Sequence, residues 1–371
     1  MARYGVDSHG AEQEADGNST YTRNLVEGLF AAPGDDAFAL FGADPGHGFY
    51  ATLPSRPGSH AIRVRQGGGL FRLATLGRMA RREGVQCLHV QYVAPLGYAR
   101  PLVVTVHDLG FLHVPEAFPP FLRMALRVLV PRSVARADRV ITPSDFCGRD
   151  IAARYGIDPG KIAVIPLGVA PRFHPRPPAE TASALERYGL RPGFLLSLGR
   201  LNRRKNLERL LLAYGRLRAA GVSEVPLVIV GKPDYGASDV LRRAKVATDG
   251  SSVRFMGVLP ETDLPYFFGG AACLVYPSLF EGFGLPVLEA MACGTPVVSS
   301  DRTALPELVG EAGLLVDPWS IDGLAAAMAR LLDDPALAGD LGEKGLERSR
   351  RYTWADTARR TLDVYREVGR R

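Results

Sequence analysis

The sequence has few cysteines and no long apolar run. The four cysteines lie far apart, without the paired spacing of a zinc site, and two of them fall in apolar runs typical of buried strands. No segment approaches the roughly 20 uncharged residues of a membrane span, and the N-terminal residues lack the apolar stretch of a secretion signal. We therefore expect a soluble, cytoplasmic protein whose thiols are reduced core residues: Cys87, Cys147, Cys273 and Cys293.

Motifs of several common enzyme classes are also missing. A P-loop, GxxxxGK(S/T), and a GxGxxG fingerprint do not occur, which argues against an NTPase and a nicotinamide dehydrogenase. A GxSxG nucleophile elbow is lacking too. There is no D-x-D tripeptide and no cluster of histidine and acid with metal spacing, so we expect neither a divalent metal nor any other cofactor. The charge of a bound phosphate must then be balanced by protein groups.

Two stretches are basic, residues 70–82 and 123–139, in a chain of net charge +6. Neither stretch comes with a nucleic-acid reading motif or exposed aromatics, so we expect no nucleic-acid partner. The functional interpretation is a peripheral contact with anionic lipid through a basic amphipathic surface, which would place the protein at the inner face of a membrane. The alternative is a solvated helix face whose arginine stems cover the core.

Short apolar runs alternate with helical patterns along the whole chain. Runs of strand length that are separated by helices predict parallel sheets covered on both faces, so the fold class is α/β with two successive doubly wound domains. The runs in the first half are YGVDS, FALFG, CLHVQY, LVVTVHD, RVITPS and IAVIPLG. Those in the second half are FLLSLG, LVIVG, VRFMG, CLVYPS, PVVSS and GLLVD.

The 371 residues exceed what one hydrophobic core usually organises, and prolines interrupt the pattern between the two halves. We predict an N-terminal Rossmann-like domain over 1–172 and a proline-rich linker over 173–193. A second Rossmann-like domain covers 194–351. The last segment, 352–371, carries Trp354, Ala358, Leu362 and Tyr365 on one helical face and could pack back on the N-terminal domain.

Residues 281–296, EGFGLPVLEAMACGTP, are the most informative segment. Glu281 lies on a glycine-rich turn, and Glu289 lies eight positions later inside the helix that follows. Gly282 and Gly284 free the backbone to approach a ligand, and Pro286 suits the first position of a helix whose amide end favours a negative group. This combination is typical of a site for a phosphorylated, hydroxyl-rich ligand.

Ligands of open α/β sheets collect beyond the carboxyl ends of the strands, so the loops after the apolar runs are the next candidates. The loop GRLNRRKN follows FLLSL and carries Arg200 and Lys205, which could hold a diphosphate; the alternative is two ordinary surface cations. Replacing Lys205 or Glu281 by alanine is expected to abolish activity and leave the fold intact, since both are predicted to lie in loops outside the core.

Two weaker candidates follow strands of the first half. His107 comes directly after LVVTV, where a neutral imidazole can exchange hydrogen bonds with sugar hydroxyls. Gly17 precedes a helix expected from about Tyr21, and backbone amides at that start could contact phosphate. We expect the other histidines to be structural: His9, His47, His60, His89, His113 and His174.

The segments HDLGFLHVPEAFP, ADRVITPSDF, VIPLGV, LGRLNRRKN and LFEGFGLPVLEAMACGTPVVSSD occur in this order. Together they resemble the retaining nucleotide-sugar glycosyltransferases of family 4. The strongest part is the E-x7-E motif of Glu281 and Glu289 beside a GR-x4-K loop. The resemblance covers nearly the whole chain and implies the GT-B architecture, two Rossmann-like domains facing across a deep cleft, with the donor on the C-terminal domain and the acceptor on the N-terminal domain.

The resemblance also implies roles for the residues of these motifs. Arg200 and Lys205 would grip the diphosphate, and Glu289 would bind the ribose hydroxyls. Glu281 would bind a hydroxyl of the transferred sugar, and His107 would lie near the attacking acceptor oxygen. Backbone amides of the turn would help: those of Gly282, Phe283, Gly284 and Leu285. One departure concerns the first loop, where many relatives carry two adjacent glycines, whereas here Gly17 is followed by asparagine.

The resulting hypothesis is a retaining enzyme that moves a hexose to a hydroxyl of a saccharide, glycolipid or metabolite acceptor, for example in polysaccharide biosynthesis. GDP-mannose is the favoured donor, and UDP-glucose and a dTDP-linked sugar are its rivals. No carboxylate is placed as a covalent nucleophile, so the resemblance favours front-face transfer. The competing classes are a GT-B phosphorylase or epimerase and a non-catalytic sugar-binding scaffold.

Overall fold

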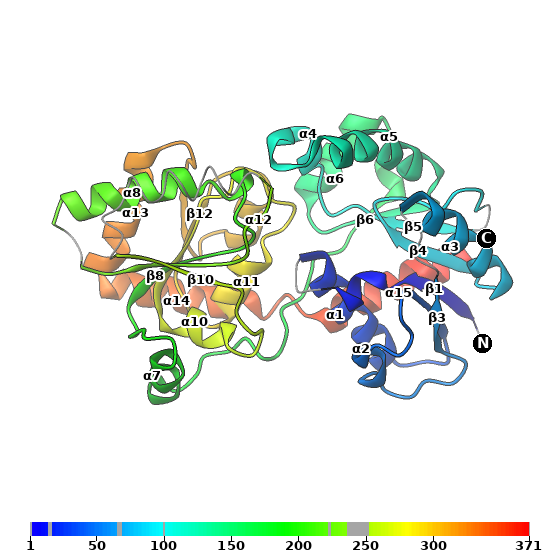
Figure 1. Ribbon diagram of the computed structural model, residues 1–371, viewed down its shortest axis with the longest axis horizontal. Helices are drawn as coiled ribbons and strands as arrows, with labels where there is room; N and C mark the ends of the chain where they lie inside the picture. Colours follow the sequence, from blue (N-terminus) through cyan, green and yellow to red (C-terminus); the bar gives the residue numbers. More distant parts are fainter. Residues whose placement is uncertain are drawn as a thin grey trace. The chain divides into compact units, whose positions relative to one another are not determined.

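The computed structural model describes residues 2–13, 17–64, 69–98, 101–221, 224–235 and 252–370. The chain forms two compact units, each built on its own sheet (Figure 1). The N-terminal unit comprises residues 1–109, 120–168 and 353–371, and the C-terminal unit comprises 110–119 and 169–352. The chain therefore crosses between the units several times.

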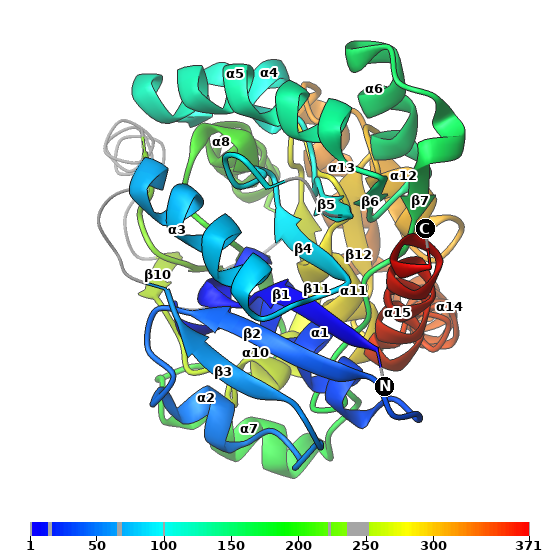
Figure 2. The ribbon, with the colours of Figure 1, turned by 90° about the vertical axis from the view of Figure 1, so that its right-hand side faces the viewer.

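The sheet of the N-terminal unit is fully parallel, with the strand order β3-β2-β1-β4-β5-β6-β7. Figure 2 shows these strands following one another from β3 at the lower left to β7 at the upper right. β2 and β5 are buried along their whole length, as expected for strands covered on both faces. The strands are β1 (Arg3–Asp7), β2 (Ala37–Gly42), β3 (His60–Arg63), β4 (Cys87–Gln91), β5 (Leu102–Thr105), β6 (Arg139–Thr142) and β7 (Ile162–Val164).

Helices cover both faces of this sheet. α1 (Gly17–Ala31) packs along α15 (Trp354–Gly369), which also contacts the central strands, while α5 (Pro120–Arg136) and α6 (Asp145–Tyr155) lie on the other side (Figure 1). The close approach of α1 and α15 requires Gly28, because a Cβ there would lie 2.7 Å from the Cβ of Ala358. The remaining helices of this unit are η1 (His9–Glu12), α2 (Gly48–Ala51), α3 (Gly69–Arg82) and η3 (Pro159–Lys161).

The four apolar residues predicted on one face of the last helix are all buried, and they carry α15 onto the N-terminal unit. Its Tyr365 hydroxyl hydrogen-bonds His89, whose other ring nitrogen lies 2.7 Å from Thr105 Oγ1. Burial, together with the neighbouring His107, lowers the pKa of His89 to about 3. His89 is thus a neutral core histidine with both nitrogens satisfied.

The C-terminal unit is a second fully parallel sheet, with the order β10-β9-β8-β11-β12-β13. α8 (Leu207–Ala219) and α13 (Ile321–Asp333) pack together, as do α11 (Leu285–Ala292) and α14 (Pro335–Ser349). The strands are β8 (Phe194–Leu198), β9 (Leu227–Val230), β10 (Val253–Gly257), β11 (Ala271–Tyr276), β12 (Val297–Ser300) and β13 (Leu314–Val316). The other helices are α4 (Gly110–His113), η2 (Pro115–Ala117), α7 (Pro178–Glu186), η4 (Arg203–Lys205), α10 (Leu264–Gly270) and α12 (Leu305–Val309).

Every apolar run predicted as a strand contains one, and only β3 was not predicted among the strands that the structure describes. β3 is a partly exposed edge strand of four residues, HAIR, whose polar ends give no apolar signal. All four cysteines are free and buried. Among the described helices, none combines the length and the apolarity that a bilayer-spanning segment requires.

The expected linker over 173–193 contains a helix. In α7, Thr181, Ala184 and Leu185 are buried, and the helix packs on α10 of the C-terminal unit. Pro175 and Pro177 precede the helix, Pro178 is its first residue and Pro192 follows it, so no proline interrupts the apolar face. The structure divides the chain at residues 168 and 352, and it adds a short piece of the first half, 110–119, to the C-terminal unit.

Candidate functional site

Each sheet has one point at which the strand order reverses, between β1 and β4 in the N-terminal unit and between β8 and β11 in the C-terminal unit. Loops that leave neighbouring strands at such a point diverge to opposite faces of the sheet and open a place for a ligand. The two predicted motifs of the second half, GRLNRRKN and EGFGLP, are the loops that follow β8 and β11. The topology therefore brings them together.

The loop after β8 turns Lys205 inward. Asn202 caps the short helix η4 by accepting from the amide of Arg204 at 3.1 Å. Asn206 then adopts a left-handed backbone with φ 56°, and its side-chain amide donates to the carbonyls of Pro277 and Pro318 at 3.1 and 2.6 Å. These bonds tie the loop after β8 to the loop after β11 and fix the start of α8.

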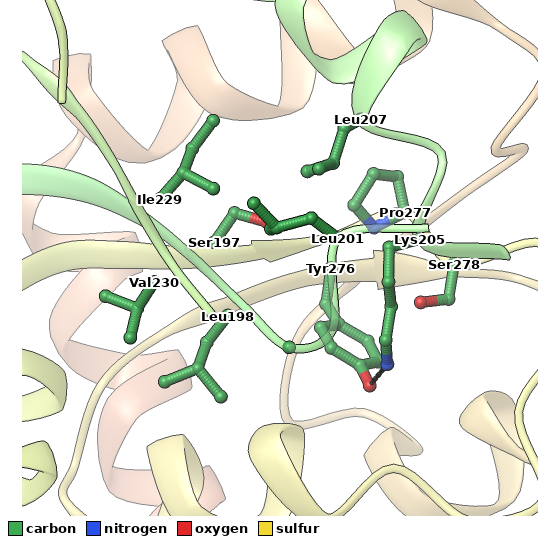
Figure 3. A pocket seen from close by; sticks show the side chains of 11 residues that line it. Ser197, Leu198, Leu201, Lys205, Leu207, Ile229, Val230, Tyr276, Pro277 and Ser278 are labelled. Carbon is green, nitrogen blue, oxygen red and sulfur yellow. Dashed lines mark hydrogen bonds between the residues drawn. The ribbon is translucent and has the colours of Figure 1, made fainter. Parts of the chain in front are cut away.

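Lys205 and Glu281 form a buried ion pair. Lys205 Nζ lies 2.7 Å from Glu281 Oε1 and also donates to the Tyr276 hydroxyl, which in turn donates to the same carboxylate oxygen at 3.1 Å. Both charged side chains are less than one tenth exposed by residue. Figure 3 shows Lys205 and Tyr276 with their hydrogen bond at the edge of a small recess next to Leu198 and Ser278.

The electrostatics of this pair keep Glu281 ionised. Burial alone would raise the pKa of Glu281, but the charges of Lys205 and Arg204 outweigh it and lower the pKa to about 2. Burial and the Glu281 carboxylate raise the pKa of Tyr276 well above its usual value, so the phenol stays protonated. The site thus holds a fixed carboxylate and a fixed ammonium group side by side.

The expectation that Lys205 and Glu281 lie outside the core is therefore wrong, and so is the alternative that Lys205 is a surface cation. Gly199, at φ 137°, explains part of this, because a Cβ there would lie 2.8 Å from Lys205 Cε. The lysine stem runs over this glycine into the interior. Arg200, by contrast, has a side chain that is 41% exposed and lies 3.6 Å from Asp234.

The glycine turn leads into α11 as predicted. Gly284 precedes the helix with φ 112°, and Pro286 lies in its first turn. A Cβ on Gly284 would lie 2.7 Å from Leu305 Cδ2, so only glycine fits there without displacing its neighbours. The amide of Glu281 donates to Thr303 Oγ1 at 3.1 Å, which holds the start of the turn.

Glu289 lies in α11 and differs from Glu281 in its electrostatics. Its side chain keeps partial access to solvent, but protein atoms surround the carboxyl group, and this burial raises its pKa to about 8, with Arg172 acting in the opposite direction. Arg172 itself pairs with Glu261 at 2.9 Å. Glu289 is therefore protonated at neutral pH in the structure as it stands.

His107 belongs to the N-terminal unit, where it lies just beyond β5 and is 9% exposed. A chain of hydrogen bonds orients it: Thr22 donates to the carbonyl of Asn18 at 2.7 Å, Gln91 Nε2 donates to Thr22 at 2.8 Å, and His107 Nε2 lies 2.8 Å from Gln91 Oε1. Because the amide oxygen only accepts, Nε2 of His107 carries a proton.

Gly17 lies at the first position of α1, four residues before the expected helix start at Tyr21. Tyr21 is instead a fully buried residue of the first turns, whose ring meets that of His107 edge to face at 4.5 Å between centroids. Gly17 itself is exposed, and a Cβ there would meet nothing within 4 Å. The position imposes no steric need for glycine.

Sequence reasoning missed several residues that build the site. Tyr276 ends an apolar run and gave no polar signal, and Thr303 lies in a turn without a motif. His113, expected to be structural, stacks on Phe280 with ring centroids 4.7 Å apart and planes at 15°. Phe280 directly precedes Glu281, so the segment 110–119 covers the side of the EGFGLP turn. Within the described ranges, His, Cys, Asp and Glu side chains nowhere gather in groups of three suited to a metal ion.

Comparisons with known proteins agree with this architecture. The family model described as Glycosyltransferase Family 4 matches residues 15–173, and that described as Glycosyl transferases group 1 matches residues 186–348. The O-antigen chain mannosyltransferase B of Escherichia coli is similar, at 33% identity over 71% of this chain and 70% of the relative. The chain belongs to the family 4 glycosyltransferases.

Other proteins similar to this glycosyltransferase carry names of other transferases and synthases. A D-inositol 3-phosphate glycosyltransferase of Catenulispora acidiphila is 32% identical over 74% of this chain and 67% of its own. Among solved structures, a sucrose-phosphate synthase from Thermosynechococcus elongatus matches with a TM-score of 0.79 and 26% identity over 99% of both chains. The prediction of two Rossmann-like, doubly wound units of the GT-B architecture is confirmed, and the protein is an enzyme that transfers a sugar from a nucleotide-sugar donor.

Proposed function

We propose that this glycosyltransferase moves mannose from GDP-mannose to a hydroxyl of a saccharide, glycolipid or metabolite acceptor, with retention of the anomeric configuration. The observation that carries the proposal is the buried pair of Lys205 and Glu281 beside the glycine turn of α11. The pair places a fixed cation and a fixed acceptor of hydrogen bonds from hydroxyls beside the amide end of a helix, at the point where the strand order reverses.

The diphosphate of the donor binds at Arg200, Lys205 and the amides of Gly282, Phe283, Gly284 and Leu285. A phosphate at this turn is favoured because the amides of a helix start carry partial positive charge. Lys205 is held in place before the ligand arrives, so its charge stabilises the departing diphosphate with little reorganisation. We propose that no metal is needed, because these cations and amides balance the charge.

The two glutamates bind different hydroxyl groups of the donor. Glu281 is ionised and accepts hydrogen bonds from the transferred sugar. Glu289, eight residues further on, binds the ribose hydroxyls. The partial burial of Glu289 means that a ligand which donates hydrogen bonds to its carboxylate also promotes its ionisation.

The N-terminal unit receives the acceptor, with His107 close to the reacting groups. Gln91 holds its Nε2 in place. The amides at Gly17, the first residue of α1, contribute a further anion contact. Because Glu281 is committed to Lys205, we propose front-face transfer, in which the leaving phosphate takes the acceptor proton, rather than a double displacement through an enzyme carboxylate.

The choice of mannose is supported by the name of the Escherichia coli relative and by the EGFGLP form of the turn together with HDLGFL. The rival donors are UDP-glucose and a dTDP-linked sugar, since no described contact fixes the base. A phosphorylase or an epimerase on the same scaffold, and a sugar-binding protein without activity, are the competing classes. Release of sugar that depends on free phosphate and needs no nucleotide would favour the phosphorylase.

A donor panel tests the proposal directly. Purified protein is incubated in EDTA with GDP-mannose, UDP-glucose or dTDP-glucose and a set of mannose-containing acceptors, and the product is examined by NMR. We expect transfer from GDP-mannose with an α-anomeric product. An inverted product would reject retention, and transfer from UDP-glucose alone would reject the donor.

We also propose that the enzyme works in the cytoplasm in peripheral contact with an anionic membrane, where lipid-linked acceptors are found. The basic stretches 70–82 and 123–139 are the sequence basis for this part of the proposal.

A further inference from the structure

Helix α5 of the N-terminal unit exposes an apolar surface. Phe121 is 88% exposed, Met124 58%, Leu122 45% and Val128 41%. On a helical wheel Phe121, Met124 and Val128 fall on one side, whereas Leu122 lies roughly 100° away from Phe121, outside this group. The other large exposed apolar residues of the described chain are scattered over several elements, so α5 carries the one helix face where they gather.

The same helix is apolar on its inner side. Val130 and Val134 are fully buried there, on the side that packs against β5 and α6. A helix that is needed only to cover a sheet has a polar outer face, because solvent contact with apolar side chains lowers stability and solubility. α5 instead has a second apolar face, which is exposed in the part of the chain that the structure describes.

Charge indicates what covers this face. The sequence of α5, PFLRMALRVLVPRSVAR, has four arginines and no acid. Arg127 and Arg132 are exposed, and Arg132 bonds the carbonyl of Val128 at 2.6 Å, at the border of the apolar residues. Apolar side chains bordered by arginine are typical of a helix that lies in the headgroup layer of an anionic bilayer.

A second copy of the chain is a poorer partner for this surface. A two-fold interface would bring the same helix face of both copies together and place the arginines of one copy close to those of the other. With no acid on the helix, these charges would repel each other. Anionic lipid supplies both an apolar interior and the opposite charge.

We infer that the outward face of α5 is the membrane-docking surface, with Phe121, Met124 and Val128 inserted among the acyl chains and Arg127 and Arg132 at the lipid phosphates. The inference rests on the proposed membrane contact and assigns it to α5. Transfer chemistry itself does not require it.

Vesicle flotation of the full chain tests the inference. We expect binding to vesicles that contain one third phosphatidylglycerol, and weak binding to pure phosphatidylcholine. Phe121→Ser with Met124→Ser should reduce the partition coefficient at least tenfold. Arg127→Gln with Arg132→Gln should lower it by roughly fivefold per arginine and remove most of its salt dependence.

A control comes from the C-terminal unit. Val258 is 64% exposed, and Val258→Ser removes exposed apolar surface at a site far from α5 in the sequence. This variant should bind vesicles like the wild type. Wild-type protein that does not float with the anionic vesicles, or a Phe121/Met124 variant that floats as well as the wild type, would overturn the inference.

Two further measurements separate the outcomes. Sedimentation velocity of the wild type without lipid should show no dimer that depends on α5. A dimer that the Phe121/Met124 substitutions abolish would show that a second copy covers this face, and it would overturn the inference. Nucleoside diphosphate binding is measured on the same variants. If the nucleotide binds but α5 does not mediate flotation, the inference fails and the transferase proposal stands. If α5 mediates flotation but no nucleotide binds, the transferase proposal fails and the docking surface stands.

Discussion

Lys205 Nζ lies 2.7 Å from Glu281 Oε1, across 76 residues of sequence. The contact joins the loops that follow β8 and β11, the two strands at which the order of the sheet reverses. The ion pair thus connects the GR-x4-K loop, which carries Lys205, with the E-x7-E motif, which begins at Glu281. Since both groups are buried, the pair links the stability of the C-terminal unit to its activity.

The first prediction concerns this pair. Lys205→Met should abolish transfer and also lower the free energy of unfolding by about 3 kcal/mol, because it leaves the Glu281 carboxylate buried without its cation. The double variant Lys205→Met with Glu281→Leu should recover most of that stability and remain inactive. Urea unfolding and transfer assays on the same preparations check this.

Arg203→Met is the control for the pair, because Arg203 is an exposed residue of the same short helix. It should change the free energy of unfolding by less than about 0.5 kcal/mol. If the Lys205 single variant is as stable as the Arg203 variant, the buried ion pair does not have the role described.

The second prediction concerns pH and Glu289. The folded-state pKa of Glu289 is raised to about 8 from an ordinary value of 4.5. Between these two values the unfolded chain has lost a proton that the folded protein keeps, so the free energy of unfolding should fall as pH rises through this window. In Glu289→Gln this contribution should vanish. Urea unfolding at several pH values from 5 to 8.5, taken as the difference between the two proteins, measures it; parallel curves would contradict the burial of Glu289.

The third prediction concerns the orientation of His107. Gln91→Met removes the acceptor of the Nε2 proton and therefore one of the contacts that orient the ring. We expect kcat to fall roughly ten- to hundredfold, with the affinity for nucleoside diphosphate unchanged. Gln91→Glu keeps an acceptor and should retain more activity than Gln91→Met. Equal activity of the methionine variant and the wild type would show that His107 needs no such support.

The fourth prediction concerns the turn before α11. Gly284→Ala forces a side chain into a left-handed backbone and against Leu305, and should cost about 2 kcal/mol of stability. Gly269→Ala is the matched control, because a Cβ at that position of α10 meets nothing within 4 Å. It should stabilise the protein by roughly 0.5 kcal/mol. Thermal unfolding of both variants decides, and similar effects would argue against strain at Gly284.

The alternation of apolar runs and helices predicted both sheets, because parallel strands that are covered on both faces need continuous apolar segments. Both motif loops were candidates because each follows a strand, and ligands of open α/β sheets collect beyond the carboxyl ends of the strands. β3 was missed because a partly exposed edge strand has little apolar character. α7 was missed because the proline-rich segment was interpreted as a linker, although its prolines lie before, at the first position of and after the helix.

The depth of the site was not predictable in the same way. Whether Lys205 is exposed depends on the packing of its aliphatic side chain against Gly199 and on its ion pair with Glu281, and both are tertiary contacts. The same holds for Tyr276, Thr303 and the chain of bonds from Asn18 to His107. Local sequence shows which groups follow a strand, but not which of them meet.

The most direct test of the account is calorimetric titration of GDP into the wild type, Arg200→Gln and Arg203→Gln, all in EDTA. Arg200 is partly exposed, so its substitution should not disturb the fold. We expect GDP to bind the wild type without metal, the Arg200 variant to bind roughly tenfold more weakly, and the Arg203 variant to bind like the wild type. Binding that occurs only after magnesium or manganese is added, or an equal affinity in the wild type and the Arg200 variant, would contradict the claim that fixed protein cations hold the diphosphate.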